Sequence, residues 1–219
     1  DLVIMFMIIM LIFTKTSAGG TNVDCHGRTA LHMAALMEDF DVVVQLISKS
    51  AQDINAVDGN GETALFLAVF NANEKIALFL LKNDADFSIH PIVGSRNTVL
   101  HFAVHNKLIK VIDFICQKYP GAISIENDTK ESPLFSAARA SSLAVMQRVF
   151  KYIGSSTSME RSSETMYDRI INAQNIYGDT IVMVAAHCKN WETVKFLLEK
   201  GADPTILNRA KNALIHIAA

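Results

Sequence analysis

The chain has 219 residues, of which 50% are hydrophobic, and its 20 Lys and Arg against 22 Asp and Glu give a formal net charge of −2. This balance offers no polyelectrolyte attraction to nucleic acid, and no dense Lys/Arg run occurs, so no nucleic-acid partner is expected. The three cysteines, Cys25, Cys116 and Cys188, are odd in number and far apart in sequence. They suggest neither a disulfide framework nor a zinc site, which favours a reduced, intracellular chain.

The chain begins with an unbroken apolar run over residues 2–13, after a single Asp. As a helix this run would rise about 18 Å, short of the roughly 30 Å hydrocarbon core, so it cannot span a membrane alone. Three interpretations stay open: a helix of a truncated repeat unit, a targeting or membrane-associated segment, or a gene-model artefact. The second lacks an initiating Met and a basic flank. We therefore separate residues 1–20, a truncated repeat helix or hydrophobic leader, from a domain over residues 21–219.

One nine-residue phrase returns along the rest of the chain, first as Gly-Arg-Thr-Ala-Leu-His-Met-Ala-Ala over residues 27–35. Its copies cover residues 61–69, 96–104, 130–138, 178–186 and 211–219. The hydroxyl or small residue in each copy sits at positions 29, 63, 98, 132, 180 and 213, so the intervals are 34, 35, 34, 48 and 33 residues. A near-constant period of this length indicates a repeat architecture.

The period and the Thr-Pro-Leu-His-like core resemble the ankyrin repeat, a β-turn followed by two antiparallel helices. The resemblance covers nearly everything from residue 20 to the end. It implies an all-α fold, an α-solenoid of stacked helix-turn-helix repeats with β-turn fingers. About five repeats and a truncated sixth are expected, and the copy that ends at residue 219 suggests a fragment of a larger protein.

Within each repeat the opening Thr or Ser is placed to cap the first helix through its hydroxyl. A buried ridge is expected from the fifth residue of each phrase, namely Leu31, Leu65, Leu100, Leu134, Val182 and Ile215. The resemblance implies that His32, His101 and His216 tie neighbouring turns by hydrogen bonds. Phe66, Phe135 and Met183 replace this histidine in the other copies.

The fingers between repeats contain Asn, Asp and Gly, which suit tight turns with positive φ and side chains bonded to their own backbone. The third finger, residues 90–96, departs from this pattern. The long interval contains an insertion over residues 152–169, where seven Ser/Thr residues predict a mobile surface loop, with a short helix over 160–167 as one option. The insertion is either functional or simply tolerated.

Sequence motifs for catalysis are absent. Cys25-His26 and His187-Cys188 are the only tempting nucleophile–base pairs, and adjacent residues generally point apart. No phosphate-binding glycine loop and no metal-ligand spacing occurs. We therefore predict a chain that is not an enzyme and needs neither cofactor nor metal.

The function that the resemblance implies is protein–protein interaction or scaffolding in the cytoplasm, through the concave face of fingers and first helices. The alternative is the cytoplasmic repeat region of a membrane protein such as an ion channel, which leaves membrane association open, and a secreted repeat protein is a third option. Phe70, Tyr177, Arg28 and Arg139 are residue types enriched in hot spots, and Phe70, Arg139 and Tyr177 are expected on three different repeats. The full set of candidate partner-binding residues is Arg28, Met37, Glu62, Phe70, Asn71, Asn97, His105, Asn106, Glu131, Arg139, Tyr177, Asp179 and His187.

Overall fold

The computed structural model describes residues 23–49, 53–89, 91, 96–153 and 166–218. These fall into two compact units that divide between Val99 and Leu100. The apolar run at residues 2–13 lies outside the described residues, as do most of the third finger and residues 154–165 of the insertion. The expectations for those segments therefore stay predictions.

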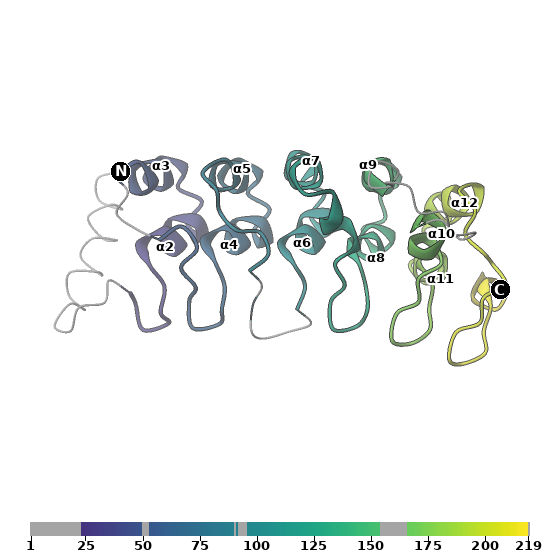
Figure 1. Cartoon of the computed structure of the whole chain (residues 1–219). Helices are drawn as coiled ribbons and strands as arrows, with labels where there is room; N and C mark the ends of the chain where they lie inside the picture. Colours follow the sequence, from purple (N-terminus) through teal and green to yellow (C-terminus); the bar gives the residue numbers. More distant parts are fainter. Residues whose placement is uncertain (1–22, 50–52, 90, 92–95, 154–165, 219) are drawn as a thin grey trace. The chain divides into compact units, whose positions relative to one another are not determined.

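Among its described residues, the first unit forms two helix pairs, which can be followed in Figure 1. In each, a short first helix is followed by a longer second helix: α2 (Ala30–Leu36) with α3 (Phe40–Ser48), and α4 (Ala64–Phe70) with α5 (Glu74–Lys82). Helix α2 packs on α4 as well as on α3, and α3 contacts α5. The repeated phrase therefore folds as the predicted first helix, and equivalent helices of successive repeats pack side by side.

Local chemistry explains where the second helices begin. Asp39 precedes α3, and its side chain accepts a hydrogen bond from the Val42 N–H at 3.1 Å. Asn73 does the same for α5 through the Ile76 N–H, also at 3.1 Å. Each cap satisfies a backbone donor that has no partner within its helix.

The second unit continues the same arrangement with more helices, whose labels follow the chain in Figure 1. Each of these helices is shorter than a dozen residues. Their bounds are α6 (Val99–His105), α7 (Ile109–Lys118), the 3-10 helix η1 (Pro120–Ser124), α8 (Pro133–Arg139), α9 (Leu143–Ile153), α10 (Met166–Ile171), α11 (Ile181–His187), α12 (Trp191–Glu199) and α13 (Leu214–Ala218).

In the second unit the first helix α11 packs on α8, α12 and α13, while the second helix α9 contacts α7, α8 and α12. Helix η1 was not predicted; it starts at Pro120 and packs on α7, α8 and α9. The described helix of the insertion, α10, lies later in the chain than the helix considered at residues 160–167. The architecture is the expected all-α stack of helix pairs.

The ridge residues are buried in all but the last copy. Leu31, Leu65, Leu100, Leu134 and Val182 are each at most 1% exposed. The expectation for Ile215 is wrong, because this side chain is 74% exposed and the preceding Leu214 is the buried residue at 7%. Helix α13 packs on α11, and within the described part of the chain no second helix follows to cover Ile215.

Candidate functional site

The fingers share one turn built around an Asp or Asn side chain. In each of the five described fingers, the Oδ1 atom of the first turn residue accepts hydrogen bonds from the backbone N–H groups two and four residues later, at 2.8–3.0 Å. These bonds fix the turn without help from other segments. The residues that supply Oδ1 are Asp24, Asp58, Asn127, Asn175 and Asn208.

The fourth residue of each of these turns adopts a positive φ. Glycine occupies it in three fingers, as at Gly178 with φ 79°, and lysine occupies it at Lys130 and Lys211, with φ 56° and 60°. The predicted turn chemistry is therefore confirmed, although two fingers use a residue that favours this conformation less than glycine does.

Two histidines connect neighbouring repeats in the predicted way. His32 Nε2 lies 2.8 Å from the Glu62 carbonyl oxygen, and His101 Nε2 lies 2.8 Å from the Glu131 carbonyl oxygen. Burial lowers the pKa of His101 below its usual value, so the neutral ring donates through Nε2. Each contact joins a first helix to the next finger.

Backbone hydrogen bonds also join adjacent fingers within each unit. In the first unit the Gly59 N–H donates to the His26 carbonyl at 2.8 Å. In the second unit the Ile176 N–H donates to the Thr129 carbonyl, and the Arg209 N–H donates to the Tyr177 carbonyl, both at 3.0 Å. The fingers therefore form a rigid frame within each unit.

The first unit exposes two large apolar side chains at the ends of its first helices. Phe70, the last residue of α4, is 56% exposed and stacks on the buried Phe66, with ring centroids 6.0 Å apart. Met37, which follows α2, is 41% exposed. Because Phe66 stands where other repeats carry histidine, its ring supports Phe70 instead of donating a hydrogen bond.

The other predicted contact residues of the first unit expose less of their side chains or are paired with another residue. The Arg28 Nε atom lies 3.5 Å from Oδ2 of the buried Asp58, in the next finger. Three further residues are half-buried: Glu62, Asn71 and Asn97. Phe70 and Met37 therefore offer most of the apolar contact surface among the predicted residues of this unit.

The second unit exposes Tyr177 at the tip of its finger, at 61%. His105 and His187, at the last positions of α6 and α11, are also exposed. Asp179 and Asn106 are half-buried, and Asp179 Oδ1 accepts a hydrogen bond from Asn208 Nδ2 at 2.8 Å. These residues come from the ends of first helices and from finger turns, as the repeat positions predicted.

Glu131 is an interior residue, which corrects the expectation that its side chain faces a partner. It is 6% exposed, and its carboxylate forms two hydrogen bonds of 2.6 Å with the Arg139 guanidinium. Asn175 Nδ2 adds a third hydrogen bond, to Oε1, at 2.9 Å. Arg139 itself, at the end of α8, keeps 41% of its side chain exposed.

The charges of this pair reinforce each other. Burial alone would raise the pKa of Glu131, but hydrogen bonds from Arg139 and Asn175, with the charge of Arg139, outweigh it and lower the pKa. The hydrogen bond to Glu131 in turn raises the pKa of Arg139, despite the opposing effect of burial. Both groups are therefore charged at neutral pH.

The part played by Asn175 was not predicted from the sequence. Its Oδ1 holds the finger turn, as in the other fingers, while its Nδ2 reaches Glu131 in the preceding repeat. The turn role is visible in the Asn-x-x-Gly pattern. The contact with Glu131 has no local signal, because the two residues are 44 positions apart.

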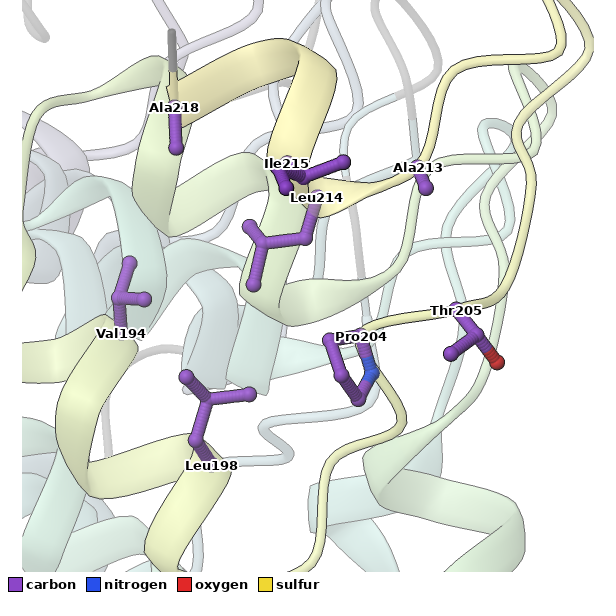
Figure 2. Close-up of a pocket in the computed structure, with 8 residues that line it drawn as sticks. All are labelled: Val194, Leu198, Pro204, Thr205, Ala213, Leu214, Ile215 and Ala218. Atoms are coloured by element: carbon purple, nitrogen blue, oxygen red, sulfur yellow. The ribbon is translucent and has the colours of Figure 1, made fainter.

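An apolar pocket of about 550 Å³ lies between α12, the last finger and α13 (Figure 2). Leu214 and Ile215 reach toward it from α13, opposite Val194 and Leu198 of α12. None of its lining side chains is an acid, a base or a metal ligand, so the pocket has the character of apolar packing surface. Its lining residues are Val194, Leu198, Pro204, Thr205, Ala213, Leu214, Ile215 and Ala218.

The Cys25–His26 pair does not point apart as expected. Cys25 Sγ lies 3.2 Å from His26 Nδ1, and Asp24 Oδ2 lies 3.9 Å from that same nitrogen. In a catalytic relay the nucleophile and the carboxylate use opposite ring nitrogens, and both here face Nδ1. The cluster is therefore an exposed contact at a finger turn, without the geometry of a triad.

Two negative findings apply to the described residues. Over residues 23–49, 53–89, 91, 96–153 and 166–218, no group of three His, Cys, Asp or Glu side chains could hold a metal ion. In the same ranges, no helix has both the length and the apolar character required to cross a membrane.

Comparison with protein families gives two matches. A profile described as three copies of the ankyrin repeat matches residues 7–91, and a single ankyrin repeat profile matches residues 177–209. Together these matches cover more than half of the chain. The first begins within the apolar run at residues 2–13.

Curated relatives share the repeats but are much longer. The NAD-dependent deacetylase sir2B of Dictyostelium discoideum is 26% identical, over 83% of this chain and 22% of its own length. The human transient receptor potential cation channel subfamily A member 1 is 28% identical, over 83% of this chain and 18% of its own length. The ankyrin repeat protein nuc-2 of Neurospora crassa is 24% identical, over 90% of this chain and 17% of its own length. The chain thus spans about a fifth of the length of these relatives.

Solved structures with the same fold include two of similar size. A chain in the structure of a predatory endopeptidase from Bdellovibrio bacteriovorus in complex with an immunity protein aligns with a TM-score of 0.71 and 26% identity. That alignment covers 87% of this chain and 90% of the other. The ankyrin repeat domain of Bcl-3 aligns with a TM-score of 0.70 and 20% identity, covering 97% of this chain and 87% of the other.

Proposed function

Because the chain belongs to the ankyrin repeat family, we propose that it is a non-catalytic interaction module that binds a partner protein through its fingers and first helices. Repeat arrays of this kind offer extended binding surfaces on a rigid frame. The observation that carries the proposal is the exposure of large aromatic side chains at a first-helix end and a finger turn, with Phe70 at 56% and Tyr177 at 61%. Large side chains of this kind often serve as anchors when an interface buries them.

The rigidity of the fingers favours binding. Side chains that are already held in place lose little conformational entropy when a partner arrives. We expect the partner to contact the exposed residues first and the half-buried ones at the margin. The proposed contact set is Phe70, Met37, Asn71, Asn97, Arg28 and Glu62 in the first unit, and Tyr177, Arg139, His105, Asn106, Asp179 and His187 in the second.

We propose a cytoplasmic location for the module. Cys25, Cys116 and Cys188 are free thiols, and the cytoplasm keeps thiols reduced. A second candidate function is the cytoplasmic repeat region of a membrane protein such as an ion channel. The match to a human cation channel over 83% of this chain favours it. The two candidates share the same binding surface and differ in what surrounds it in the full-length protein.

The test is photo-crosslinking from positions on the fingers and first-helix ends, followed by identification and purification of the captured protein. Binding of that protein is then measured for the wild type and for Phe70→Ala and Tyr177→Ala. Each substitution should weaken binding by ~1–2 kcal/mol, about five- to thirty-fold, with little change in melting temperature. Arg139→Ala is not a clean variant, because it would leave the buried Glu131 carboxylate without its cation.

Gln45→Ala and Lys195→Ala are matched controls, since both side chains are exposed on second helices. The proposal predicts unchanged binding for these controls. If the controls weaken binding and the Phe70 and Tyr177 substitutions do not, the partner uses another face and the proposal fails.

A further inference from the structure

Two exposed candidate residues of the second unit are connected by one buried hydrogen-bond network. Glu131 holds Arg139 through two hydrogen bonds of 2.6 Å. Asn175 donates to Glu131 Oε1 at 2.9 Å, and its own Oδ1 accepts from the Tyr177 N–H at 2.9 Å. The network therefore runs from the end of α8, through the fourth finger, to the tip of the fifth.

Glu131 and Asn175, the two buried residues of this network, are well placed to fix Arg139 and the backbone at Tyr177. Glu131 is 6% exposed and Asn175 is 5% exposed, so water competes poorly for their hydrogen bonds. Further bonds hold the same fingers: the Ile176 N–H donates to the Thr129 carbonyl, and His101 Nε2 lies 2.8 Å from the Glu131 carbonyl oxygen. A planar guanidinium held at both Nη atoms has little rotational freedom left.

We propose that Glu131 and Asn175 are positioning residues: Glu131 holds the Arg139 side chain, and Asn175 holds the backbone at Tyr177, so that both residues are presented to the partner. The inference rests on the proposed binding function and adds which side chains prepare the surface. Sequence position alone assigned Glu131 to the contact surface itself. Its burial and its three hydrogen bonds support the positioning role instead.

The same network indicates the kind of partner. Because the Glu131 carboxylate already neutralises the Arg139 guanidinium, the pair carries no net charge and attracts acidic peptides weakly. The remaining guanidinium N–H groups can still donate hydrogen bonds, and the Tyr177 ring offers a flat apolar face. This combination fits an uncharged segment of a partner protein, with backbone carbonyls or side-chain amides beside an apolar side chain.

The first experiment needs no partner. Order parameters are measured by ¹⁵N relaxation for the Arg139 Nε–H and, as an exposed reference, for Arg209 Nε–H in the whole chain. In the wild type we expect a value for Arg139 near that of rigid backbone, about 0.85, and a value for Arg209 below about 0.6. Glu131→Gln should lower the Arg139 value to that of Arg209. Asp113→Asn is the matched control, because it removes the carboxylate that lies 3.3 Å from Arg148 in the same unit and should leave Arg139 unchanged.

A double variant separates positioning from simple stabilisation of the fold. Glu131→Gln with Asn175→Asp exchanges donor and acceptor, so a hydrogen bond between the two fingers is retained. The carboxylate introduced at position 175 can still accept hydrogen bonds from the finger backbone, but Arg139 faces a neutral amide with one acceptor oxygen. A purely structural role predicts that this variant recovers both its melting temperature and the Arg139 order. A positioning role predicts a recovered melting temperature while Arg139 stays mobile.

The second experiment uses the purified partner captured by crosslinking. The double variant should bind it about ten-fold more weakly than the wild type, and raising the salt concentration from 50 to 500 mM should change wild-type affinity less than three-fold. Unchanged Arg139 order in Glu131→Gln, or full-strength partner binding by the double variant, would overturn the inference. Neither result would contradict the proposed binding function, which is tested separately by partner binding of Phe70→Ala and Tyr177→Ala.

Discussion

The three thiols differ in exposure and should therefore differ in reactivity. Cys25 and Cys188 are exposed, whereas Cys116 is 1% exposed within α7. Burial, with a smaller effect from the charge of Asp113, raises the pKa of Cys116 to about 12. Since the thiolate is the reactive form, a maleimide at pH 7.5 should label Cys25 and Cys188 quickly and Cys116 only after unfolding. Mass spectrometry of timed samples checks this, and equal labelling rates at all three sites would show that α7 is not packed as described.

Glu131 predicts a specific dependence of stability on pH. Its folded-state pKa is lowered, so the carboxylate contributes stability that is complete above its unfolded pKa and disappears as pH falls through the folded value. The difference in unfolding free energy between the wild type and Glu131→Gln should be constant from pH 7 to about pH 5 and shrink below about pH 4.5. Urea denaturation across this range measures it. A difference that grows on acidification would mean that folding raises, instead of lowers, the pKa of this carboxylate.

The residue scale also shows where sequence reasoning is sufficient. The hydrogen bonds of His32 and His101 to the next finger could be predicted, because each histidine sits at a fixed place in the repeated phrase. The burial of Glu131 could not, because it depends on Arg139 and Asn175 meeting it from two other segments. A charged residue at a finger position is buried only when residues of other segments form hydrogen bonds with it. The local sequence does not show whether such contacts form.

Among the elements, the fingers offer a matched pair of substitutions. Lys130 and Gly178 occupy equivalent turn positions, with φ 56° and 79°. Lys130→Gly removes a left-handed penalty of roughly 1–2 kcal/mol but adds freedom to the unfolded chain, so a net gain of about 0.5–1 kcal/mol is expected. Gly178→Ala should cost at least about 1–2 kcal/mol, since the new Cβ would also lie 2.7 Å from the Arg209 backbone nitrogen. Chemical denaturation of both variants is the measurement, and effects of the same sign would contradict the shared turn geometry.

The helices themselves follow closely from the repeated phrase, because a capping residue and a buried ridge residue recur at fixed places within each copy. The short helix η1 does not follow from it. Pro120 ends the regular α7 pattern, and the next residues form a 3-10 turn that buries Ile123 against neighbouring helices. No described segment of the other copies forms a similar helix, so comparison between repeats could not reveal it. The burial of Ile215 was predicted wrongly for a different reason. Its place in the repeated phrase was identified correctly, but burial at this place requires a neighbouring helix.

At the scale of the whole chain, stability in a repeat protein is approximately a sum of terms within repeats and between neighbours. Helix α4 packs mainly on α2 and α5, and α8 packs mainly on α9, α11 and η1. Among the described helices named here, none belongs to both sets. Substitutions in α4 and α8 should therefore act independently, whereas substitutions within one set should not.

Leu65 in α4 and Leu134 in α8 test this independence, since both are 0% exposed. Each Leu→Ala substitution should cost ~2–5 kcal/mol, through lost burial and the cavity left behind. The double variant should lose the sum of the two values to within about 0.5 kcal/mol. As a coupled control, Leu134→Ala is combined with Val182→Ala, because α8 and α11 pack together and their cavities can merge or collapse jointly. Denaturation of all five variants gives the coupling energies. Strong coupling between Leu65 and Leu134, with additivity between Leu134 and Val182, would contradict the nearest-neighbour packing on which the repeat frame depends.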